Sequence, residues 1–60
     1  MNNQFSAESI VIILEKMGVP ETTATLLVLK HAEACESARG PAQAATRIAM
    51  LEFAAAQKGN

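Results

Sequence analysis

The sequence predicts an all-α fold, a small three-helix domain over residues 7–17, 20–39 and 41–58. Apolar residues recur in each segment at the i, i+3, i+4 and i+7 spacing of a helix that packs on a core. Glycine lies at or just beyond the end of each predicted helix, and proline opens the second and third helices. This punctuation is typical of helix termini.

The whole chain, residues 1–60, forms one predicted domain, with residues 1–5 frayed and residues 59–60 following the last helix. A chain of this length buries only about 60% of the surface that its unfolded form exposes. Cys35 is the single cysteine, so no disulfide can form within the chain, and no His/Cys cluster offers a metal site. We therefore expect a homodimeric helical bundle with no metal and no cofactor.

The charges are few and scattered, with five Lys+Arg against six Asp+Glu and a formal net charge of −1. Without a basic cluster, binding to nucleic-acid phosphates is not expected. The longest apolar run, Ile10 to Leu14, is far below the ~20 residues needed to span a bilayer. No lysine or arginine precedes it as in a secretory signal, and a lone thiol fits a reducing compartment, so we expect a cytoplasmic protein without a membrane partner.

The first helix, residues 7–17, has start and stop signals on both sides. Ser6 is the expected N-cap, Glu8 lies in the first turn, and Phe5 and Ile10 have the spacing of a hydrophobic staple. Gly18 is expected in the left-handed conformation that ends a helix, and the proline after Val19 prevents continuation. The inward stripe comprises Ala7, Ile10, Ile13, Leu14 and Met17.

The second helix, residues 20–39, is the one around which the fold is expected to assemble. Pro20 suits a first helical position, and Gly40 is expected to close the helix in a left-handed conformation. One face forms a core stripe that consists of Ala24, Leu27, Val28, His31, Ala34, Cys35 and Ala38.

The third helix, residues 41–58, starts at Pro41 and is apolar around most of its circumference. Such a helix is usually buried on more than one side. Its main core face comprises Ala44, Ala45, Ile48, Leu51 and Ala55.

Several large apolar residues fall outside all three core stripes, and together they form the predicted partner or dimer interface. Arg47 is expected at its rim, where it would orient a partner together with Lys30 and Glu33. Single exposed apolar residues are common on protein surfaces, so scattered surface positions are the alternative interpretation. The interface candidates are Ile12, Leu26, Leu29, Met50 and Phe53.

His31 lies within the core stripe of the second helix, and Glu52 lies on the apolar side of the third. The two residues are about equally far from the Gly40-Pro41 turn, so antiparallel packing would bring them together. We expect a buried polar pair, because buried polar groups find hydrogen-bond partners. The chain has no aspartate and no second histidine to complete a nucleophilic set. We therefore assign no catalytic residue and do not expect an enzyme.

Residues 10–29 resemble the helix-turn-helix family of repressors, with Gly18-Val19 in the turn of "LEKMGVPETTATLL". The resemblance implies a second helix that enters the major groove of DNA, with Thr22, Thr25 and Lys30 nearest the duplex. The sequence departs from that pattern at Leu14, where the family has a small residue. The would-be recognition helix also lacks the arginine, glutamine or asparagine that reads base edges.

The features together predict a small cytoplasmic regulator, adaptor or inhibitor that binds a larger protein. It would act as a homodimer through an apolar helical surface. A degenerate helix-turn-helix transcriptional regulator is the alternative.

Overall fold

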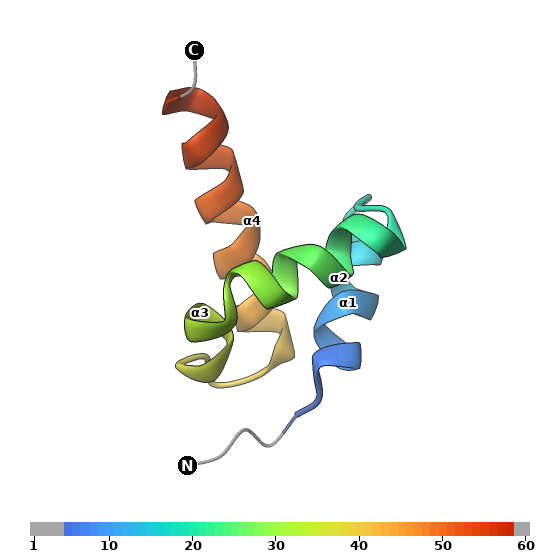
Figure 1. Ribbon diagram of the computed structural model, residues 1–60. Helices are drawn as coiled ribbons and strands as arrows, with labels where there is room; N and C mark the ends of the chain where they lie inside the picture. Colours follow the sequence, from blue (N-terminus) through green and yellow to red (C-terminus); the bar gives the residue numbers. More distant parts are fainter. Residues whose placement is uncertain (1–4, 59–60) are drawn as a thin grey trace.

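The computed structural model describes residues 5–58, which form four helices and no strand (Figure 1). The all-α prediction is confirmed. The expectations for residues 1–4 and 59–60 lie outside the described residues. The helices are α1 (Ala7–Lys16), α2 (Glu21–Lys30), α3 (Ala32–Glu36) and α4 (Pro41–Lys58).

The start of α1 follows the sequence prediction. Ser6 is the N-cap, and its Oγ accepts a hydrogen bond of 3.3 Å from the backbone N–H of Ser9. This bond satisfies one of the amides that have no partner in the first turn of a helix. Phe5 is half-buried and packs against the core, so the expected fraying does not extend to this residue.

The end of α1 is a Schellman motif. Gly18 has a φ of 100°, and its N–H donates to the carbonyl of Glu15 at 2.9 Å. The N–H of Val19 donates to the carbonyl of Leu14 at 3.0 Å. These two bonds satisfy carbonyls of the last turn and confirm the left-handed glycine. Met17 is the C-cap, one residue beyond the helix proper.

The predicted second helix is not continuous. It starts at Glu21 with Pro20 as its N-cap, and it breaks at His31, whose φ of −109° and ψ of 42° are not helical. His31 therefore ends α2 and begins α3, and α3 ends at Glu36, short of the predicted residue 39. The core stripe nonetheless faces inward, with Ala24, Val28 and Cys35 buried.

The connection between α3 and α4 differs from the prediction. Gly40 does not adopt the expected positive φ. Among residues 5–58, Gly18 is the one residue with a positive φ. The chain turns instead with help from a side chain, since Oε1 of Gln43 accepts a 2.7 Å hydrogen bond from the N–H of Arg39. Pro41 begins α4 as predicted.

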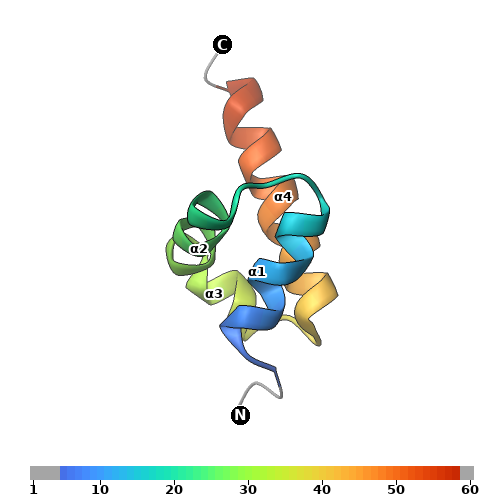
Figure 2. The ribbon, with the colours of Figure 1, turned by 90° about the vertical axis from the view of Figure 1, so that its right-hand side faces the viewer.

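The helices pack around α1, which contacts both α2 and α4, while α3 packs on α4 (Figure 2). The C-terminal half of α4 extends beyond the other helices in both views of the ribbon (Figures 1 and 2). The core is small and consists of Ile10, Leu14, Ala24, Val28, Cys35, Ala44, Ala45 and Ile48.

Four residues predicted to face inward are exposed. Ala7 and Met17 lie at the two ends of α1, and Leu51 and Ala55 lie in the extending half of α4. Their positions follow the helical spacing of the core stripes, but neighbouring helices do not cover them. At 1.5 Å per residue, the 18 residues of α4 outrun the 10 residues of α1 on which it packs.

Candidate functional site

Large apolar side chains are exposed on three of the four helices. The exposed set includes all five interface candidates, together with two residues for which sequence reasoning predicted burial. Their exposed fractions are 52% for Ile12, 50% for Met17, 61% for Leu26, 69% for Leu29, 65% for Met50, 47% for Leu51 and 66% for Phe53. Within residues 5–58, seven large apolar side chains are thus exposed, almost as many as the eight residues of the core.

The exposed leucines of α2 lie on the side of the helix opposite its core contacts. Leu26 and Leu29 are three residues apart and therefore neighbours on the helix surface. The buried residues Ala24 and Val28 face the other way, toward α1. We call the surface formed by Leu26 and Leu29 the α2 face.

Leu29 also borders an apolar groove of about 210 Å³ between the start of α1 and the α2–α3 segment. Phe5 and Ile10 form one side of the groove, and Val28 and Cys35 lie on the other. The groove is open and shallow, with Glu36 as its charged lining residue. It extends the α2 face toward the N-terminal end of α1.

The exposed residues of α4 follow one another closely. Met50, Leu51 and Phe53 lie in the C-terminal half of α4, the part that extends beyond the other helices (Figure 1). Met50 and Phe53 are three residues apart, whereas Leu51 continues the core stripe one turn beyond Ile48. Helix lengths alone could have indicated that Leu51 lies beyond the reach of the first helix. We call Met50, Leu51 and Phe53 the α4 face.

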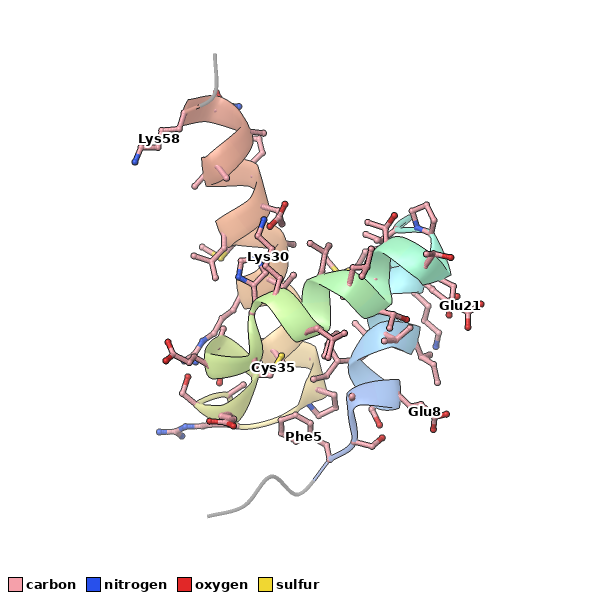
Figure 3. All side chains as sticks on the ribbon, viewed as in Figure 1. Phe5, Glu8, Glu21, Lys30, Cys35 and Lys58 are labelled. Atoms are coloured by element: carbon pink, nitrogen blue, oxygen red, sulfur yellow. The ribbon has the colours of Figure 1, made fainter. Side chains whose placement is uncertain are left out.

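A polar cluster lies between the α2–α3 break and α4. The Nε2 atom of His31 is 2.8 Å from Oε2 of Glu52, and Nζ of Lys30 is 2.9 Å from the same oxygen. Figure 3 shows the Lys30 side chain beside α4. The predicted contact between His31 and Glu52 is therefore present, but sequence reasoning missed Lys30 as a second partner.

This cluster is not buried as predicted. The side chains of His31 and Glu52 are 16% and 33% exposed, and that of Lys30 is 61% exposed. Hydrogen bonds from His31 and then from Lys30 lower the pKa of Glu52, and both exceed the opposing effect of partial burial. Because an ionised carboxylate only accepts hydrogen bonds, Nε2 carries the proton in the contact with His31.

An open depression of about 320 Å³ adjoins the cluster. Its lining side chains offer one imidazole, one ammonium and one carboxylate, but no hydroxyl or thiol that could act as a nucleophile. The lining carboxylate is that of Glu33, whereas Glu52, which is engaged by two donors, does not line the depression. The lining residues are Lys30, His31, Ala32, Glu33, Ala34 and Leu51.

Arg47 does not lie free at the rim of an interface. Its guanidinium donates a 2.7 Å hydrogen bond to Oγ of Ser37, and that hydroxyl donates to the carbonyl of Ala34 at 3.3 Å. The side chain therefore ties α4 to the end of α3. Sequence reasoning missed this role because the partner hydroxyl lies in an irregular turn whose direction the sequence pattern does not give.

Cys35 is buried, as predicted from its place in the core stripe, and it forms no disulfide within residues 5–58. Burial, and to a lesser degree the negative charge of Glu36, raises the pKa of the thiol. Nowhere in residues 5–58 do three or more His, Cys, Asp or Glu side chains come together as a metal site would require.

None of the described helices combines the length and apolar character that crossing a bilayer requires. Comparison of the chain with models of protein families, with curated proteins and with solved structures gave no match.

Proposed function

We propose that this chain is a small cytoplasmic protein-binding regulator, adaptor or inhibitor that acts as a homodimer. In this proposal the α2 face and the α4 face are its two contact surfaces. One face would be occupied by a second copy of the chain, and the other by a larger protein.

The observation that carries the proposal is the exposure of Leu26, Leu29, Met50 and Phe53, each more than 60% exposed. Large apolar side chains exposed next to one another on a helix commonly mark a contact with another protein. Leucine, methionine and phenylalanine on a helix also suit a partner that binds helices in a groove.

The small core supports self-association. Three large side chains are fully buried, those of Ile10, Leu14 and Ile48. A single core of this size rarely supplies more than about 3–5 kcal/mol in so short a chain. Because a twofold dimer uses the same surface on both copies, one apolar face would suffice to bury the equivalent residues of two chains.

The paired arrangement of α1 and α2, joined through the Gly18 turn, favours one second candidate, the degenerate helix-turn-helix regulator. Two of the five lysine and arginine side chains of the protein, one of them on the would-be recognition helix, are engaged within the protein itself. The Lys30 ammonium bonds to Glu52, and the Arg47 guanidinium bonds to Ser37. Phosphate contacts depend on lysine and arginine, so protein binding is the better supported function.

The test is to measure mass in solution and partner capture for two double variants. Leu26→Asp with Leu29→Asp alters the α2 face, and Met50→Asp with Phe53→Asp alters the α4 face. The matched control is Thr22→Asp with Thr23→Asp, which adds the same charge to exposed positions of α2 without removing apolar surface. Circular dichroism verifies that each variant remains helical.

We expect a dimer for the wild type and the control, a monomer for one face variant, and loss of a stoichiometric protein partner from nuclease-treated lysate for the other. A monomeric wild type at micromolar concentration that retains no protein would contradict the proposal. Salt-sensitive binding of the wild type to duplex DNA would instead favour the second candidate.

A further inference from the structure

We propose that the α2–α3 segment is a hinge with two states, and that the contact between His31 and Glu52 selects the bent one. When Glu52 is released, residues 21–36 form one continuous helix and α3 leaves the surface of α4. This inference concerns the fold itself and does not depend on the proposed function.

The sequence of the segment gives no local cause for a break. Residues 21–36 contain no glycine and no proline, and the residues on both sides of His31 are good helix formers. Sharp bends in helices usually occur at proline, at glycine, at a bulge, or where a side chain enters the backbone ladder. The bend at His31 therefore calls for a cause outside the segment.

The tertiary contact supplies that cause. His31 is the residue with non-helical dihedral angles, and its side chain contacts Glu52 on α4. Lys30, the last residue of α2, binds the same carboxylate oxygen. Two adjacent residues at the bend are thus fixed to one atom of another helix, so the direction of the chain at this point depends on Glu52.

Apart from Glu52, the bent state is held by the packing of the short helix α3 on α4. α3 has five residues, too few to be stable as an independent helix, and Cys35 is its one buried residue. Two exposed hydrogen bonds add to the packing on α4, one from Arg47 to Ser37 and one from the N–H of Arg39 to Gln43. A continuous helix would recover backbone hydrogen bonds across His31, which offsets part of the lost packing. Two states of similar free energy are the condition for a switch.

The first test is an NMR comparison of the wild type with Glu52→Ala, using the Cα chemical shifts of His31 and Ala32 and the amide NOEs between them. We expect non-helical shifts at His31 in the wild type and helical shifts across residues 30–32 in the variant. Glu15→Ala is the matched control, because it removes an exposed glutamate from α1 and leaves the hinge untouched.

The second test uses the buried thiol of Cys35 as a reporter of the position of α3. Straightening removes this thiol from the core, so its reaction with a disulfide reagent should accelerate by about tenfold or more in Glu52→Ala, as for a locally opened segment. The rate should not change with low urea concentrations. A rate that rises steeply with urea would report global unfolding and would count against the hinge.

If Glu52→Ala does not fold, the same two measurements are made on His31→Ala. This variant removes the same contact and places a strong helix former at the bend. Helical shifts across residues 30–32 together with a reactive Cys35 would support the hinge. A break that persists at residue 31 in either folded variant, with Cys35 still protected, would overturn it.

Discussion

The imidazole Nε2 of His31 lies 2.8 Å from Oε2 of Glu52, and this contact joins the break between α2 and α3 to the middle of α4. The two residues are 21 positions apart in the chain. The contact spans the whole α3–α4 connection. One of its two residues, His31, is also the residue at which the helix breaks.

Acidification should weaken the protein through Glu52. The hydrogen bonds from His31 and Lys30 lower the pKa of this carboxyl below its ordinary value of 4.5. A carboxyl whose pKa is lower in the folded state stabilises that state above its unfolded pKa, and the contribution is lost as the pH falls through the folded pKa.

Urea unfolding of the wild type and Glu52→Gln at neutral pH and below pH 4.5 measures this effect. The free energy of unfolding should fall on acidification by a larger amount in the wild type than in Glu52→Gln. Equal losses in both proteins would show that Glu52 does not contribute to the pH dependence. The remaining carboxyl groups are the same in both proteins, so the difference between the two losses of stability reports on Glu52.

The two described glycines should respond differently to alanine. Gly18 has a φ of 100° with open space around its Cα, so Gly18→Ala should cost about 1–2 kcal/mol of stability from backbone conformation alone. Gly40 has equally open space but no positive φ. Gly40→Ala is therefore the matched control, and thermal or urea unfolding should show a clearly smaller change. A Gly18→Ala variant as stable as the wild type would contradict the Schellman assignment.

Ile48 and Leu51 lie on one stripe of α4, one turn apart, yet truncation should affect them very differently. Ile48 is fully buried, so Ile48→Ala should destabilise the protein by about 2–5 kcal/mol. Leu51 is 47% exposed, and Leu51→Ala should change the stability of a single chain by less than about 1 kcal/mol.

The measurement is urea unfolding at several protein concentrations. A large loss for Leu51→Ala that grows with protein concentration would place this residue in a dimer interface. A large loss of stability in Leu51→Ala that does not depend on protein concentration would mean that α4 packs more extensively than the structure shows.

Cys35 should be a slow nucleophile in the folded protein. Burial raises the pKa of its thiol, and the nearby charge of Glu36 adds to the effect. Glu36→Gln should therefore lower the pKa measured from thiolate absorbance, but only in part, because burial is the larger cause. Glu33→Gln, an exposed glutamate of the same helix, is the control. A return of the Cys35 pKa to its ordinary value in Glu36→Gln would assign the whole shift to charge.

Local signals in the sequence were enough to predict the all-α class, the ends of α1, the start of α4 and the core stripe of each predicted helix. These features depend on local chemistry: the hydroxyl of Ser6, the backbone freedom of Gly18, the ring of Pro41 and the helical spacing of apolar residues. The exposed residues Leu26, Leu29, Met50 and Phe53 were also predictable, because they fall outside every core stripe.

The break at His31, the second bond to Glu52 from Lys30 and the exposure of Leu51 depend on how the helices pack. The break has no signal in residues 21–36, since its partner lies on another helix 21 positions away. The exposure of Leu51 depends on where α1 ends relative to α4, which periodicity does not specify. Local interactions thus set which residues form helices and which way they face, whereas contacts between helices set where the chain bends and which apolar side chains remain uncovered.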